Sequence, residues 1–267
     1  MVPPARTRVI VHTAHRDLAR EQMGTTWGNS LVLQPADRGT AAGILLPVLD
    51  VYQSDHSAVV VVLPSDHAVS DCELFTAGIR KAIWAVEREP GLLVLGGVAG
   101  DTPQTDYGWI VPERGPGMHE PLTVHRVRRF VEKPLLLQAQ ALLQEGALWN
   151  TFVLVGRART IIELVGQQYP ALTAGLFDYV TLEPGEREGW LAANFSGLPC
   201  ADFSADVLES CGNLAVLEWP PSLGWVDLGT PERLINWLND VGEVHQQYVW
   251  EDAARDPTPS GVCPSMP

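Results

Sequence analysis

The chain has 267 residues, 46% of them hydrophobic, which is enough for one large α/β domain with a sizeable core. Its formal net charge is −14, from 18 Lys and Arg against 32 Asp and Glu. This balance argues against a general DNA- or RNA-binding surface, because neutralising phosphates requires clustered cations. It does not argue against a nucleotide substrate, whose charge a metal ion and one or two local cations can meet.

No apolar run reaches the roughly 18 residues that a membrane-spanning helix needs. The first residues contain Arg6 and Arg8 but no apolar signal region. The four cysteines are scattered and show no CxxC spacing, which is typical of a chain from a reducing compartment. We therefore expect a cytoplasmic protein that binds neither membrane nor nucleic acid.

Strands and helices alternate along the first hundred residues. Apolar runs predict strands at 9–11, 31–33, 59–63 and 92–95, and the segments between them predict helices at 12–23, 41–52 and 72–88. Because helices separate successive strands, this pattern favours a doubly wound parallel sheet. The valine-rich run from Val59 predicts a central strand of that sheet, buried on both faces.

The later part of the chain is patterned differently. A turn and strand are predicted at 105–111, a hairpin loop at 115–120, a half-exposed strand at 124–131, further strands at 149–155 and 214–219, and helices after Pro134, at 160–169 and at 231–240. Residues 183–199 are poorly patterned. The tail at 256–267 is rich in Pro and Ser and is expected to be disordered, so that the domain covers residues 1–255.

Two acidic turns follow apolar strands that lie far apart in the sequence. Asp66 ends the run that begins at Val59, and Asp227 precedes a helix that Pro231 opens. Open α/β sheets bind ligands at the carboxyl ends of their strands, and two carboxylates from separate strand ends can hold one Mg²⁺ against a phosphate. Two plainer interpretations stay open. Asp66 can form only a local turn, and Asp227 can simply complement the dipole of the helix that follows it.

Six short motifs occur in an order that resembles the sugar-1-phosphate nucleotidylyltransferases. They are QPADRGTAA from Gln34, LPSDH from Leu63, YGWI from Tyr107, FVEKP from Phe130, WNT from Trp149 and GWVDLG from Gly224. They look most like the mannose-1-phosphate guanylyltransferase branch, and the resemblance covers nearly the whole chain. It implies a Rossmann-like α/β nucleotidyltransferase domain with three layers and a mixed, mainly parallel sheet.

The resemblance also implies a reaction, in which the phosphate oxygen of a sugar 1-phosphate attacks the α-phosphorus of a nucleoside triphosphate and pyrophosphate leaves. It implies GTP and mannose 1-phosphate as the substrates and Mg²⁺ as the cofactor; a homo-oligomer stays open. The implied catalytic residues are Asp66, Lys133 and Asp227, with the two Asp as metal ligands and Lys133 against the sugar phosphate. The implied substrate-binding residues are Gln34, Arg38 and Thr40 on the guanine side, and Tyr107, Gly108, Glu132 and Asn150 on the sugar side.

Some of these positions have plainer interpretations. Glu132 and Lys133 are neighbours on a predicted strand, so they should point to opposite faces and one can be a surface charge. Tyr107 and Gly108 can form only a turn. His67 is expected to make local hydrogen bonds rather than bind a metal.

The chain also departs from the family pattern. The family begins with a loop of the form GGxGxRLxP that cradles the triphosphate, and these 267 residues contain no such segment. Phe152 stands where the WNSG motif has glycine. We therefore expect a chain truncated at its N-terminus relative to the family, with little turnover but some sugar-nucleotide binding. The alternative to an enzyme is a non-catalytic remnant that binds a sugar nucleotide or a partner subunit.

Overall fold

The computed structural model describes residues 2–24, 30–114 and 122–239. Six strands form the main sheet, in the order β3 (Val59–Val62), β8 (Leu148–Arg157), β5 (Leu93–Ala99), β9 (Leu214–Trp219), β7 (Val124–Val131) and β6 (Trp109–Pro112). The long strand β8 also pairs with β6, so the sheet closes on itself between these two strands. Two further ladders are separate from it: β1 (Val9–His12) with β2 (Leu31–Gln34), and β4 (His67–Ala68) with β10 (Val226–Asp227).

Pairing within the main sheet is mostly antiparallel. β5 and β9 are parallel, whereas β8 is antiparallel to β3, β5 and β6, and β7 is antiparallel to β9 and β6. The expected mixed sheet is confirmed, but its parallel share is smaller than the sequence pattern suggested. Alternating strands and helices predict parallel pairing only when strands that follow one another in the chain also lie next to one another in the sheet. Here β8 lies between β3 and β5 and is antiparallel to both.

The valine-rich strand β3 lies at an edge of the main sheet. Among the described residues it pairs with β8 alone, and its four valines are all partly exposed. The prediction of a central strand is therefore wrong, although each face of the strand packs against a core cluster: Val60 and Val62 against one, Val59 and Val61 against the other. An apolar run shows that a strand has apolar surroundings, but it does not show how many strands flank it.

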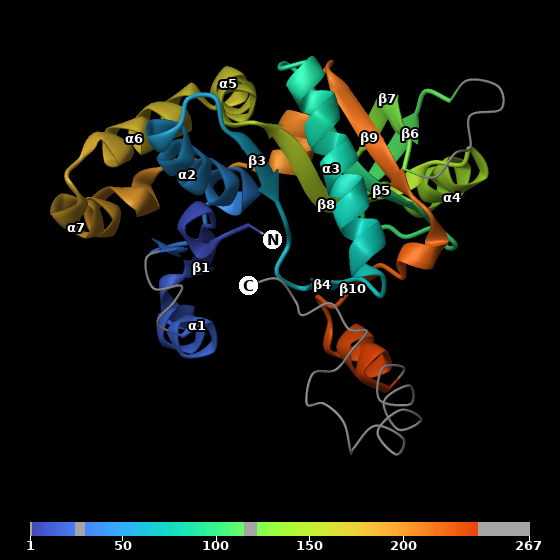
Figure 1. The fold of residues 1–267 in the computed structure, drawn as a ribbon, viewed down its shortest axis with the longest axis horizontal. Helices are drawn as coiled ribbons and strands as arrows, with labels where there is room; N and C mark the ends of the chain where they lie inside the picture. The colour runs from blue at the N-terminus through green and yellow to red at the C-terminus, as the bar shows by residue number, and fades with distance from the viewer. Residues whose placement is uncertain (1, 25–29, 115–121, 240–267) are drawn as a thin grey trace.

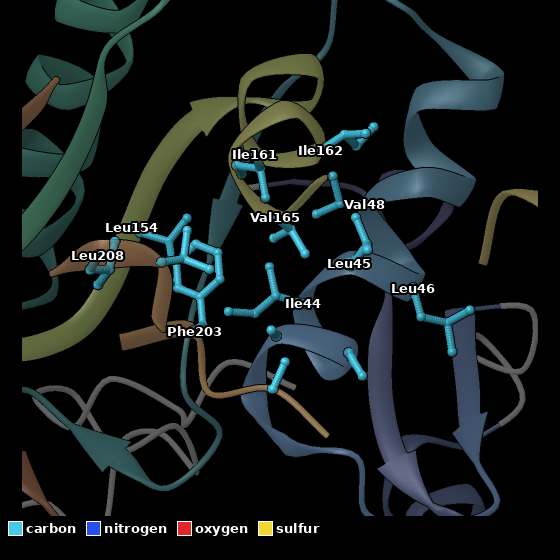
Figure 2. Close-up of a cluster of buried hydrophobic side chains, with 14 of the residues drawn as sticks. Ile44, Leu45, Leu46, Val48, Leu154, Ile161, Ile162, Val165, Phe203 and Leu208 are labelled. Carbon is cyan, nitrogen blue, oxygen red and sulfur yellow. The ribbon is translucent and has the colours of Figure 1, made fainter. Parts of the chain in front are cut away.

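Helices cover both faces of the main sheet and so form the three expected layers (Figure 1). Alternate residues of β5 face opposite sides. Leu93 and Leu95 pack with α2 (Gly39–Ser54), α5 (Ala158–Gln168) and α6 (Pro170–Thr181), whereas Val94 and Val98 pack with α3 (Cys72–Arg88). Figure 2 shows the first of these clusters, in which the apolar faces of α2 and α5 meet.

The remaining elements complete the layers. They are α1 (Arg16–Met23), α4 (Leu136–Gln144), α7 (Pro184–Asn194), a π-helix (Phe203–Leu208), a helix over residues 231–239, and 3₁₀ turns at Pro4–Arg6, Thr13–His15, Phe195–Gly197 and Pro221–Leu223. The sequence pattern missed α6, and it also missed α7, where Gly185 and Gly189 weaken the helical signal. The predicted loop at 115–120 and the predicted disordered tail at 256–267 lie outside the described residues. Among the helices described here, none combines the length and apolar character that a bilayer-spanning segment needs.

Candidate functional site

The structure brings the two acidic turns together. In the antiparallel β4–β10 ladder, Asp227 lies opposite His67, the residue after Asp66. The Leu228 N–H donates to the Asp66 carbonyl oxygen at 2.8 Å. A Cβ built on Gly229 would lie 2.9 Å from Asp227 Oδ1 and 3.3 Å from Asp66 Oδ2, so the two carboxylates face one point.

This pair of carboxylates fits a divalent cation. The Asp66 side chain is 58% exposed, and its Oδ1 lies 4.0 Å from His67 Nε2. Asp227 Oδ1 accepts the Gly229 N–H at 2.7 Å, and Oδ2 accepts Arg233 Nη1–H at 2.6 Å. No group of three His, Cys, Asp or Glu that could hold a metal occurs in the described part of the chain. A cation here would therefore take its other ligands from water or substrate, as Mg²⁺ commonly does.

The residues that the resemblance places on the sugar side gather around Gly108, just before β6. The Gly108 carbonyl accepts the Asn150 N–H at 2.8 Å, and the Tyr107 carbonyl accepts the Lys133 N–H at 3.2 Å. A Cβ on Gly108 would lie 2.6 Å from Glu132 Oε2, so a larger residue would displace that carboxylate. The ends of three strands thus bring Tyr107, Gly108, Glu132, Lys133 and Asn150 together.

Glu132 and Lys133 lie on the same side of the chain, although they are neighbours in the sequence. Lys133 has a φ of 43°, and its Nζ lies 3.6 Å from Glu132 Oε1. The expectation that they point to opposite faces is wrong, because the left-handed backbone at Lys133 ends the strand alternation. The Lys133 side chain is 60% exposed and that of Glu132 is 13% exposed. Burial raises the pKa of the Glu132 carboxyl, and its Oε2 has no hydrogen-bond partner among the described residues.

Tyr107 connects these residues to the carboxylate pair. Its ring packs edge-on against Trp149 and Trp225, with centroids 5.2 and 5.9 Å apart. The Arg233 guanidinium carbon lies 5.1 Å from the same ring centroid. Burial, supported by the negative charge of Asp227, raises the pKa of Tyr107 to about 12. The phenol therefore remains a hydrogen-bond donor near neutral pH.

His67 makes a local contact, as expected from the sequence. Its Nδ1 accepts the Trp225 Nε1–H at 3.3 Å. Burial lowers the pKa of the imidazole, against the opposing charges of Asp66 and Asp227. Sequence reasoning overlooked Trp225 and Arg233. The motifs carry no signal for Arg233, because its contact with Asp227 depends on the direction of the helix that follows residue 230.

The turn over residues 34–40, which the resemblance places against guanine, is held by a segment from a distant part of the chain. The Thr40 hydroxyl accepts the Phe203 N–H at 2.7 Å, and the Ala201 carbonyl accepts the Ala41 N–H at 3.0 Å. Gly39 has a φ of 78°, and a Cβ there would lie 2.2 Å from the Ala201 oxygen. Thr40, which the resemblance places against the substrate, is thus engaged in holding the fold.

The two other residues expected on the guanine side each have a buried donor atom without a hydrogen-bond partner among the described residues. These atoms are Gln34 Nε2 and Arg38 Nε. Asp202, in the segment that holds this turn, lies close enough to Glu132 to affect its pKa. Burial raises the pKa of the Glu132 carboxyl most, and the negative charge of Asp202 raises it further. The segment that holds this turn therefore borders the sugar-side residues.

Known proteins are similar to this chain in sequence and in architecture. A family model described as nucleotidyl transferase matches residues 4–243. Mannose-1-phosphate guanylyltransferase of Sinorhizobium fredii is 31% identical over 249 residues, which cover 87% of this chain and 44% of that protein. Xanthan biosynthesis protein XanB of Xanthomonas campestris is 29% identical over 242 residues, which cover 88% of this chain and 49% of that protein. The chain spans about half the length of these curated relatives.

Solved structures show the same fold. The mannose-1-phosphate geranyltransferase structure from Thermus thermophilus has a TM-score of 0.72 and 27% identity, and the match covers 86% of this chain and 63% of that one. The mannose-6-phosphate isomerase structure from Helicobacter pylori has a TM-score of 0.66 at 23% identity, over 83% of this chain and 84% of that one, and it supports the fold alone. Because the family model covers most of its length, the chain belongs to the nucleotidyl transferase family.

Proposed function

We propose that this chain forms the site of a mannose-1-phosphate guanylyltransferase. In that reaction, a phosphate oxygen of mannose 1-phosphate attacks the α-phosphorus of GTP, and pyrophosphate leaves with the electrons of the broken phosphoanhydride bond. The observation that carries the proposal is that the Asp66–Asp227 pair and the residues around Gly108 lie in one region, joined through Tyr107. The sugar nucleotidyltransferase relatives support the reaction class, and the choice of mannose and guanine is our proposal.

The sugar-side residues can each make a distinct contact. The exposed ammonium group of Lys133 would meet the sugar phosphate. Glu132 Oε2, which is buried without a partner among the described residues, would accept a hydrogen bond from a sugar hydroxyl. Asn150 Oδ1 already accepts the Phe152 N–H at 3.1 Å, which leaves the Asn150 amide nitrogen to donate to the sugar. The reaction needs no protein nucleophile, because binding positions the reactants and fixed charges stabilise the transition state.

The carboxylate pair would hold the divalent metal that members of this family typically use. We propose Mg²⁺, because both ligands are carboxylate oxygens. When bound there, it would neutralise charge on the transferred phosphoryl group. On the guanine side, Gln34 and Arg38 would use their unpaired donors, whereas Thr40 would keep the turn in place.

The test is calorimetric titration of the 267-residue chain with GDP-mannose, UDP-glucose and GDP in the presence of Mg²⁺. We expect GDP-mannose to bind most tightly. We also expect Glu132→Gln to weaken its binding by about 10-fold, which corresponds to the loss of one hydrogen bond to a charged group. Glu163→Gln is the matched control, because Glu163 is an exposed carboxylate on α5. Equal affinity for the three ligands would contradict the proposal.

A pyrophosphate-release assay with GTP and mannose 1-phosphate accompanies the titration. We expect release to need both substrates but to stay far below the ~1 s⁻¹ of an ordinary enzyme, because these residues lack the GGxGxR loop. Tight GDP-mannose binding with no release at all would favour the non-catalytic alternative. Release that proceeds equally well without mannose 1-phosphate would contradict the proposed reaction.

A further inference from the structure

Arg233 lies against the carboxylate pair from the helix over residues 231–239. Its Nη1 is 2.6 Å from Asp227 Oδ2, and its guanidinium carbon is 5.1 Å from the Tyr107 ring centroid. The side chain of Arg233 is 28% exposed and that of Asp227 is 15% exposed. Water and salt therefore screen this ion pair less than they screen an open surface pair.

The position of Arg233 conflicts with metal binding at Asp227. A guanidinium stays charged at every pH that the protein tolerates. Asp227 Oδ1 is engaged by the Gly229 N–H and Oδ2 by Arg233. A divalent cation between Asp66 and Asp227 would need one of these two oxygens and would lie beside a fixed positive charge. Within the described residues, no further carboxylate, thiol or imidazole completes a metal site that could outweigh this repulsion.

We propose that Arg233 competes with a divalent cation for Asp227. Its guanidinium binds Asp227 Oδ2 and must leave that oxygen before a divalent cation can bind there. Metal binding by the protein alone is then weak. A phosphate that arrives with the metal gives the displaced guanidinium a new anionic partner. This inference rests on the proposed function in one respect: it assumes that the cation bound by Asp66 and Asp227 is the one used in nucleotidyl transfer.

The test is Mn²⁺ binding without nucleotide or sugar, followed from the electron paramagnetic resonance signal of free Mn²⁺. Arg233→Gln should bind Mn²⁺ more tightly than the unchanged chain, on the order of tenfold, because a like charge next to the cation is removed. Arg159→Gln is the matched control, because it removes the same charge from α5, which lies at the top of the view, whereas β4 and β10 lie below the main sheet (Figure 1). It should leave Mn²⁺ affinity unchanged.

Two further variants locate the effect. Asp66→Asn introduced into Arg233→Gln should abolish the gain in affinity. Arg233→Lys keeps the charge but loses the planar fork, so it should bind Mn²⁺ with an affinity between those of the unchanged chain and Arg233→Gln. Circular dichroism and thermal unfolding check that each variant folds, and Arg233→Lys carries the test if Arg233→Gln does not.

The proposal is overturned if Arg233→Gln binds Mn²⁺ no more tightly than the unchanged chain. It is also overturned if Arg159→Gln shows an equal gain, since the effect would then come from net charge alone. Because this assay contains neither GTP nor sugar, it can support the role of Arg233 even when guanylyl transfer is not observed. In the same way, specific GDP-mannose binding can be observed when Arg233 has no effect on Mn²⁺.

Discussion

Phe152 adopts a backbone conformation that few bulky residues tolerate. Its φ is 56°, in the left-handed region, and its N–H donates to Asn150 Oδ1 at 3.1 Å. Its ring packs against the cluster formed by α2, α5 and α6. A left-handed conformation costs an L-residue roughly 1–2 kcal/mol. Ring packing and the Asn150 hydrogen bond offset this cost, at a position where related motifs have glycine.

Phe152→Gly should therefore be more stable than Phe152→Ala, by about 1 kcal/mol. Both variants lose the ring, but only alanine keeps a Cβ in the left-handed conformation. Val153 has no positive φ, so the order of the two variants should reverse there. Val153→Gly should be less stable than Val153→Ala by about 0.5–1 kcal/mol. Urea unfolding measures all four variants. The same order at both positions would show that Phe152 is not strained.

Glu132 should make stability depend on pH in a predictable direction. Its pKa is raised from 4.5, first of all by burial. The folded state therefore binds this proton more tightly than the unfolded state, so the contribution of Glu132 to stability is largest at low pH and is lost as pH rises through the folded pKa. Glu132→Gln cannot ionise, so it should raise the melting temperature at pH near 7 and lose this advantage below the ordinary pKa of 4.5. Thermal unfolding across pH tests this, with Glu163→Gln as the exposed control. A constant difference between Glu132→Gln and the unchanged chain at every pH would refute the assignment.

Among the secondary-structure elements, the start of α2 depends on its contact with residues 201–203. Gly39→Ala would place a Cβ 2.2 Å from the Ala201 oxygen, in a residue whose φ is 78°. We expect a loss of about 2–4 kcal/mol in the free energy of unfolding. Gly189→Ala is the control, because Gly189 lies inside α7 with no atom within 4 Å of the added Cβ. It should gain about 0.5–1 kcal/mol. Equal effects of the two substitutions in urea unfolding would argue against the contact.

Some elements could be predicted from the sequence because their signals are local. The bounds of α3, β7 and β9 match the predicted ranges, and α3 begins after Asp71, whose side chain accepts the Leu74 N–H. The pairing of β8 with β3 and β5 could not be predicted, because contacts between distant segments decide it. The motifs identify the residues that gather around Gly108. The contact of Arg233 with Asp227 could not be read from them, since it depends on the direction of the helix after residue 230.

Across the fold, the β1–β2 pair is separate from the main sheet. Among the described residues, β1 pairs only with β2, and β3 pairs only with β8. By contrast, β5 lies between β8 and β9. Amides on an unpaired strand edge open to water more easily than those of a flanked strand. Hydrogen exchange followed by mass spectrometry should therefore be faster in 9–12 and 59–62 than in 93–99. Equal protection in the three segments would mean that other groups cover these edges.

The proposed sugar-nucleotide site draws its residues from six separate segments of the chain. Hydrogen exchange with and without saturating GDP-mannose, in the presence of Mg²⁺, shows whether these segments respond to one ligand. We expect the nucleotide sugar to slow exchange together in 34–40, 64–68, 105–109, 130–134, 148–151 and 224–229, because each segment carries a residue of the proposed site. Protection confined to other segments, or no change at saturating ligand, would mean that these residues do not form a single sugar-nucleotide site.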